Sequence, residues 1–154
     1  RSHGERTASV DRDRRLGRHD EAIASAERAM QLSAAHPEIH AAAAYVFGQA
    51  GQVDIARRLL DRLASLAQGR YVSAALLAQA GVTICDEKRT LEWLEQAYEE
   101  HAADLVWLAV RPAFKGLRSN KRFRTLCERM GLPRAAGHRR RSTLRGTKKQ
   151  KRAR

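Results

Sequence analysis

Apolar and small side chains recur along this chain at the three- and four-residue spacing of α-helices. In the segment 20–32 they fall on one helical face, at Ala22, Ile23, Ala26, Ala29 and Met30. The same spacing predicts further helices over residues 39–49, 53–67, 72–83, 89–100 and 119–130. The pattern therefore indicates an all-α protein of short helices, each of which buries one face against a neighbour.

Proline, glycine and polar residues predict where these helices begin and end. Pro37 suits the first turn of a helix, which places His36 just before it. Gly48 and Gly51 mark the end of that helix. Ser119 is the expected N-cap of the last helix, because its hydroxyl can accept a hydrogen bond from a free backbone N–H.

A constant interval of 34 residues relates the helices to one another. It connects Ala22 with Ala56 and Thr90, Ala26 with Leu60 and Leu94, and Ala29 with Leu63 and Ala97. The predicted turn positions Gly17, Gly51 and Cys85 keep the same interval. Such a period indicates an array of stacked helix pairs.

Small residues give this period a physical meaning. Ala44 and Ala78 on the first helices, opposite Ala56 and Thr90 on the second, allow the paired backbones to approach closely. Over residues 17–100 the chain resembles a tetratricopeptide repeat (TPR) protein. That resemblance implies a solenoid of antiparallel helix pairs.

A narrower resemblance begins at residue 71. It rests on Tyr71-Val72-Ser73, Thr90-Leu91-Glu92-Trp93-Leu94-Glu95-Gln96-Ala97-Tyr98-Glu99-Glu100, Leu105-Val106-Trp107-Leu108, Pro112-Ala113-Phe114, Leu117-Arg118-Ser119, Arg122-Phe123 and Gly131-Leu132-Pro133. This segment is similar to the C-terminal TPR segment of multidomain bacterial regulators, including winged-helix and TolB-related regulators and some Ser/Thr kinases. The resemblance implies a fragment of a larger signalling or transcriptional regulator. Where the family has Asp-Pro, this chain has Arg111-Pro112 and Asn120-Lys121, so looser turns are expected there.

The two ends of the repeat region are predicted to differ. Residues 104–133 are expected to form a helical cap through Phe114, Leu117, Phe123, Leu126, Cys127 and Met130. The helix expected at 5–15 has only Ala8 and Val10 as apolar residues, so it cannot cover the helix at 20–32. We expect a poorly ordered or truncated segment at 1–18 and a TPR-like solenoid at 19–133. Either upstream repeats are missing, or the helix at 20–32 has a bare flank and promotes self-association.

The net charge of the chain is concentrated in residues 134–154, which we call the tail, and not in the repeats. The net charge is +13, yet residues 19–133 contain equal numbers of acidic and basic residues. Residues 134–154 hold ten Lys or Arg and no acidic residue, which favours a disordered segment. The candidate polyanion-binding residues are Arg139, Arg140, Arg141, Arg145, Lys148, Lys149, Lys151 and Arg152. The alternative interpretation is that these charges only keep the chain in solution.

The inner face of a TPR stack is lined by its first helices, which here predicts a candidate peptide groove. By repeat position the groove contains Glu38, Ala41, Tyr45, Gln49, Val72, Ala75, Gln79 and Thr83. This set includes no Lys, Arg or Asn. A site that clamps a peptide carboxylate is therefore not expected.

The sequence contains no motif that indicates catalysis. GxSxG, HExxH, P-loop, dinucleotide and kinase signatures are absent, so no enzyme activity and no cofactor are expected. His36 and His40 have the i, i+4 spacing of helical metal ligands, but with His36 before the helix we interpret both as surface residues. Cys85 and Cys127 are interpreted as buried free thiols rather than as a disulfide.

Two further groups of residues receive structural interpretations. Trp93 and Trp107 lie in apolar periodic stretches and are predicted to pack in the core. Glu92, Glu95, Glu99 and Glu100 form an acidic stripe that is predicted to be a solvated helix face.

Together these patterns predict a non-enzymatic TPR scaffold that binds a protein or peptide. The alternative is a nucleic-acid-associated protein that acts through its basic tail. Apolar runs are too short for a membrane span and no signal segment precedes them, so a cytoplasmic protein without membrane contact is expected.

Overall fold

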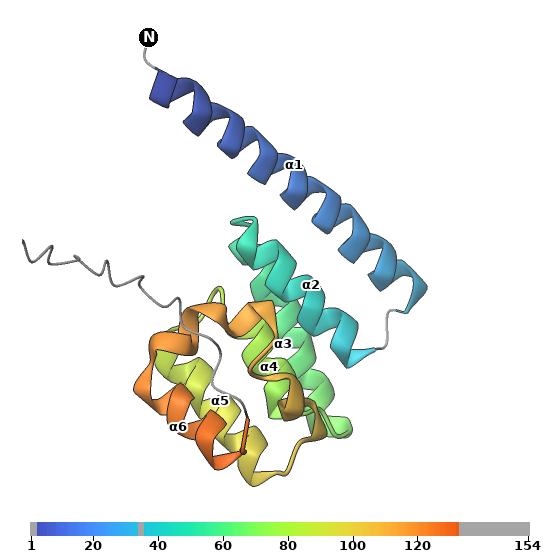
Figure 1. Cartoon of the computed structure of the whole chain (residues 1–154). Helices are drawn as coiled ribbons and strands as arrows, with labels where there is room; N and C mark the ends of the chain where they lie inside the picture. Colours follow the sequence, from blue (N-terminus) through green and yellow to red (C-terminus); the bar gives the residue numbers. More distant parts are fainter. Residues whose placement is uncertain (1–2, 34–35, 133–154) are drawn as a thin grey trace, which may run out of the picture.

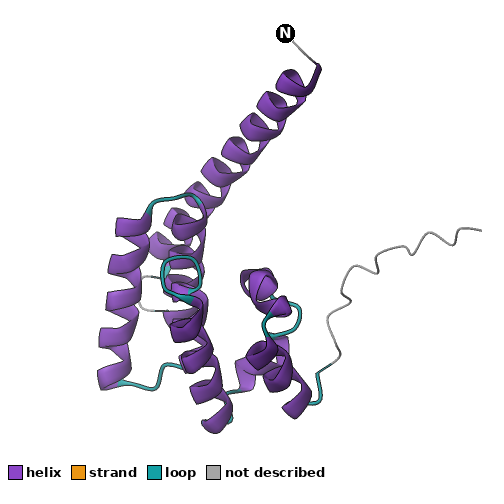
Figure 2. Ribbon diagram, turned by 90° about the vertical axis from the view of Figure 1, so that its left-hand side faces the viewer, coloured by secondary structure: helices purple, strands orange, loops and turns teal. Residues whose placement is uncertain are grey.

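The computed structural model describes residues 3–33 and 36–132, and within these ranges all regular structure is helical (Figures 1 and 2). The α-helices are α1 (His3–Leu32), α2 (Pro37–Gln49), α3 (Val53–Gly69), α4 (Ala74–Gly81), α5 (Glu87–Glu99) and α6 (Lys121–Arg129). Two 3-10 helices, η1 (Ala103–Trp107) and η2 (Pro112–Ser119), lie between α5 and α6. The prediction of an all-α protein is confirmed for this part of the chain.

The first helix is much longer than predicted. The 34-residue interval places a turn at Gly17 between two helices, but α1 passes through that position without a break. A glycine in a helix interior costs only about 1 kcal/mol relative to alanine. A Cβ atom added to Gly17 would have no neighbour within 4 Å, so no packed element imposes a turn there.

Helix α2 begins within two residues of the predicted start and ends at the predicted residue. His36 has an extended backbone and Pro37 occupies the first turn. The helix ends at Gln49, between Gly48 and Gly51, as the sequence predicts. The turn that follows depends on Gly51, whose φ of +79° lies in the region that favours glycine. The short turn then returns the chain along α2 as α3.

Side chains cap the later helices. The Ser73 hydroxyl accepts from the Ala75 N–H at 3.2 Å, and the Asp86 carboxylate accepts from the Arg89 N–H at 2.7 Å. The predicted cap at Ser119 is wrong, because that residue ends η2. Asn120 caps α6 instead, and its Oδ1 accepts from the N–H groups of Arg122 and Phe123. Asparagine and aspartate are both favoured N-cap residues, so Asn120 can take this role at a position where Asp would be expected from the resemblance.

The largest core cluster joins α4 and α5 to the segments that follow them. Its fully buried members include Leu94, Leu108, Phe114 and Phe123, and the Phe114 and Phe123 ring centroids lie 6.5 Å apart. All six residues predicted to cover this end, from Phe114 to Met130, belong to the cluster or pack against it. The C-terminal end of the helical stack is therefore closed by the chain itself.

The opposite end is more sparsely packed. Ile23, Ala26 and Met30 of α1 are only partly buried, against the small cluster of Ala43, Phe47 and Ala56. Beyond this contact the N-terminal part of α1 extends past the other helices (Figures 1 and 2). None of the described helices is both long and apolar enough to span a membrane.

The prediction that Trp107 packs in the core is wrong. Its side chain is 58% exposed, whereas Leu105 and Leu108 are buried. In a 3-10 helix, residues three apart lie on the same side, so turning Leu105 and Leu108 inward turns Val106 and Trp107 outward. Trp93, by contrast, packs against two of the core clusters, as predicted.

Candidate binding groove between α2, α4 and η2

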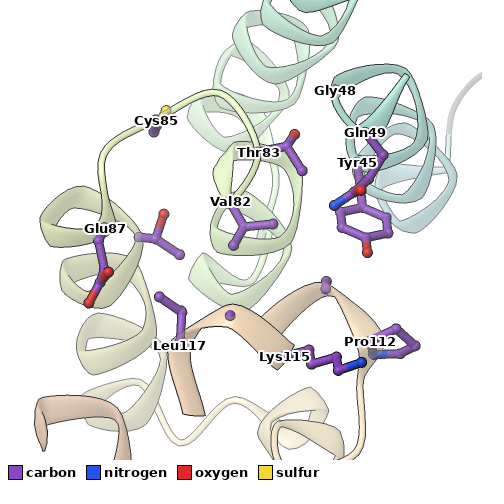
Figure 3. A pocket seen from close by; sticks show the side chains of 13 residues that line it. Tyr45, Gly48, Gln49, Val82, Thr83, Cys85, Glu87, Pro112, Lys115 and Leu117 are labelled. Atoms are coloured by element: carbon purple, nitrogen blue, oxygen red, sulfur yellow. The ribbon is translucent and has the colours of Figure 1, made fainter. Parts of the chain in front are cut away.

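Two neighbouring hollows lie between α2, α4 and η2, and we call them together the α2–η2 groove. Figure 3 shows the larger one. The larger hollow has a volume of about 940 Å³ and the smaller about 330 Å³. They share Tyr45, Pro112 and Ala113. A groove of this size is large enough for several side chains of a bound segment.

The predicted groove residues fall into two groups. Tyr45, Gln49 and Thr83 line the larger hollow, and Glu38, Tyr45 and Gln79 line the smaller one. The remaining predicted positions, Ala41, Val72 and Ala75, are buried in the core instead. Helices α2 and α4, with the turn after α4, thus bring the five polar positions to the two hollows, while the apolar positions are buried.

The cap contributes cations that the repeat positions did not predict. Lys115 lines the larger hollow and Arg111 the smaller one, and an Arg111 N–H donates to the Gln79 side-chain oxygen. The predicted groove positions contain no Lys or Arg, but the observed hollows also include these two cations. Both cations come from the segment around η2, which lies outside the 34-residue register. The three-residue spacing of Leu105 and Leu108, and of Phe114 and Leu117, is the signal that could have placed it.

A close contact between α2 and the turn that follows α4 borders the larger hollow. A Cβ atom on Gly48 would clash with Oγ1 and Cβ of Thr83, so glycine allows α2 to approach this turn closely. The Thr83 hydroxyl is buried and has no hydrogen-bond partner in the described part of the chain. Gly48 thus lies next to the predicted helix end and is also a packing position.

Burial raises the pKa of Tyr45 and of both cysteines. Desolvation raises the pKa of Tyr45, whose ring points from α2 toward η2 in Figure 3. Desolvation, followed by the nearby Asp86 carboxylate, raises the pKa of the half-buried Cys85 thiol. Burial also raises the pKa of Cys127. Both cysteines are free, and in the thiol form neither is an activated nucleophile.

The acidic stripe of α5 is not simply a solvated face, because α6 lies against it. The Arg122 guanidinium donates to both carboxylate oxygens of Glu95, at 2.7 and 3.1 Å. Arg129 lies 3.8 Å from Glu99 and stacks on the Tyr98 ring. The stripe is thus partly neutralised by the chain itself and is a weaker candidate for binding a basic partner.

The two histidines lie in different environments. His36 is exposed as predicted, but His40 is buried, with its Nδ1 3.0 Å from the His36 carbonyl. Burial follows from its position on the inner side of α2, next to Ala41. Across residues 3–33 and 36–132 no three His, Cys, Asp or Glu side chains gather in a way that would hold a metal ion.

The candidate polyanion-binding residues from Arg139 to Arg152 lie outside the described residues. No family model, curated protein or solved structure matches the chain.

Proposed function

We propose that this chain is a non-enzymatic TPR-type interaction module that binds an extended peptide segment of another protein in the α2–η2 groove. The 34-residue interval and the order of contacts support a TPR arrangement, since α2 packs against α1, α3 and α4, and α4 packs in turn against α5. We further propose that the module belongs to a larger cytoplasmic bacterial regulator.

The composition of the groove carries this proposal. Tyr45, Gln49 and Gln79 present hydrogen-bonding groups beside the apolar surfaces of Val82, Pro112 and Leu117. Few polar groups among apolar ones are typical of sites that bind peptides or small molecules. An open groove formed by helices suits an extended segment better than it suits a compact ligand.

A steric block tests the proposal. Gly116 lines the larger hollow, and a Cβ atom there would meet nothing within 4 Å, so Gly116→Phe fills the groove without disturbing the core. Gly69→Phe is the matched control, because Gly69 is equally unobstructed and lies outside the groove. A library of random peptides displayed on phage should enrich binders on the wild type and on Gly69→Phe. Loss of these binders on Gly116→Phe is expected, whereas retained binding, or no enrichment on the wild type, would contradict a peptide-binding groove.

A second candidate function rests on the charge distribution. The tail, residues 134–154, holds ten basic and no acidic residues, whereas residues 19–133 are balanced. If about six of these charges contact phosphates, affinity for DNA falls about 10³-fold between 50 and 200 mM salt. Removing residues 134–154 should abolish this binding, and unchanged DNA binding by the shortened chain would exclude the tail.

A further inference from the structure

The two hollows of the α2–η2 groove are each balanced in charge. Glu87 and Lys115 line the larger hollow and lie on opposite sides of it in Figure 3. Glu38 and Arg111 line the smaller hollow. Among the described residues, no ion pair joins Glu87 to Lys115 or Glu38 to Arg111. Each hollow therefore presents one negative and one positive charge to a ligand, and neither hollow has a net charge.

This balance disfavours a charged side chain in either hollow. Such a side chain loses water when it enters, and it meets a like charge together with the opposite one. Two of the four charged groups also bond to neutral side chains already, since Arg111 donates to Gln79 and Glu87 accepts from the Asn120 amide. The attraction gained is then small compared with the cost of desolvation. An uncharged side chain avoids that cost and can cover the apolar surfaces of the groove.

Tyr45 lies where the two hollows meet, because it lines both of them together with Pro112 and Ala113. Its ring points from α2 toward η2 in Figure 3, with the hydroxyl at the far end. Neither Pro112 nor Ala113 has a side-chain donor or acceptor, and the Tyr45 hydroxyl has no hydrogen-bond partner within the part of the chain that the structure describes. Desolvation raises the pKa of Tyr45, so the hydroxyl keeps its proton and can donate it in a hydrogen bond.

We infer that the α2–η2 groove binds an uncharged peptide segment, whose backbone carbonyl accepts a hydrogen bond from Tyr45 and whose uncharged side chains enter the two hollows. This inference rests on the proposed function and names the chemistry of its ligand. The tail of this chain, with ten Lys or Arg and no acidic residue, finds no net negative charge in the groove. An acidic segment equally finds no net positive charge there.

Selection of random peptides displayed on phage against the full chain tests the charge of the occupant. The segment shared by the enriched peptides should contain no Lys, Arg, Asp or Glu. In a synthetic peptide of that segment, Lys or Glu at a contact position should each weaken binding about tenfold. Its dissociation constant should change less than about twofold between roughly 50 and 500 mM salt, because no net charge is paired on binding.

Removal of one charge from a balanced hollow gives a matched comparison. Lys115→Gln leaves Glu87 as the only charge of the larger hollow and should shift the selection toward peptides that contain Lys or Arg. Lys121→Gln is the control, because Lys121 is exposed on α6 and lines neither hollow. Melting curves by circular dichroism establish that the variants are folded. Unchanged selection on Lys115→Gln, or the same shift on Lys121→Gln, would overturn the inference.

The hydroxyl of Tyr45 has its own readout. Tyr45→Phe removes only the hydroxyl and should weaken the selected peptides about fivefold, as expected for the loss of one hydrogen bond. Tyr71→Phe is the matched control, because Tyr71 is exposed and lines neither hollow. Equal affinities of Tyr45→Phe and Tyr71→Phe would overturn the hydrogen bond from Tyr45.

The outcomes distinguish this inference from the proposed function. Enrichment of charged segments, or binding that weakens steeply with salt, would overturn the inference and leave peptide binding intact. Displacement of the selected peptides by a synthetic peptide of residues 134–154 would identify the tail as the occupant. Dimerisation on size exclusion that the selected peptides suppress would identify a second copy, and either result would overturn the inference. Absence of any enrichment would overturn both proposals.

Discussion

The two ends of the helical stack are covered by different amounts of buried apolar surface. At the C-terminal end, Phe114 and Phe123 are almost fully buried over α4 and α5. At the N-terminal end, Ile23 and Met30 of α1 are only partly buried over α2 and α3. The difference shows that a helix can be the longest in the molecule and still contribute little to its core, because stability follows buried apolar area rather than helix length.

Truncation of one core residue at each end should give the largest contrast. Phe123→Ala should lower the free energy of unfolding by about 3–5 kcal/mol through the lost burial and the cavity that remains. Ile23→Ala should cost less than about 2 kcal/mol, because Ile23 is only partly buried. Urea unfolding followed by circular dichroism measures both, and equal losses would show that α1 matters as much as the cap.

A pair of glycine substitutions sharpens the comparison, because the expected effects have opposite signs. Gly48→Ala should destabilise the chain by about 1–3 kcal/mol through the clash with Thr83. Gly17→Ala should stabilise it by about 0.5–1 kcal/mol, since α1 is helical and unobstructed there. Thermal and urea unfolding test both, and Thr83→Ala should partly rescue Gly48→Ala. Destabilisation by Gly17→Ala would contradict a continuous α1.

Removal of the α6 cap should have an intermediate effect at the C-terminal end. Asn120→Ala should cost about 1 kcal/mol, because two backbone N–H groups of α6 lose their acceptor. Ser119→Ala is the control and should leave the free energy of unfolding nearly unchanged. The reverse order of effects would restore Ser119 as the cap.

The ion pair between α5 and α6 should contribute least. Arg122 and Glu95 are both substantially exposed, so solvent screens their attraction although the geometry is bidentate. A double-mutant cycle with Arg122→Ala and Glu95→Ala should show a small favourable coupling at low salt. At about 1 M salt, where the screening length is about 3 Å, the coupling should shrink further. A coupling that is large and independent of salt would show that α6 docks through charge.

Much of the helical arrangement was predictable because it depends on local spacing. Residues 53–67 alternate apolar and charged side chains at helical intervals, and α3 covers that segment with two further residues. The groove positions Tyr45 and Gln79 followed from the same register. Arg111, Lys115 and Trp107 did not. Trp107 and Lys115 lie in 3-10 helices and Arg111 immediately precedes one, and the three-residue period of these helices differs from the one used to assign faces.

The sequence by itself determined that the described chain is helical, where most helices begin and end, and which apolar residues close the C-terminal end. These properties depend on side-chain spacing, capping groups and apolar content, all of which are local. Only the tertiary structure decided that Gly17 lies within a helix, that Gly48 packs against Thr83 in the turn after α4 and that cations of the cap border the α2–η2 groove. Each of these depends on which distant backbone or side chain lies nearby, and a one-dimensional pattern does not contain that information.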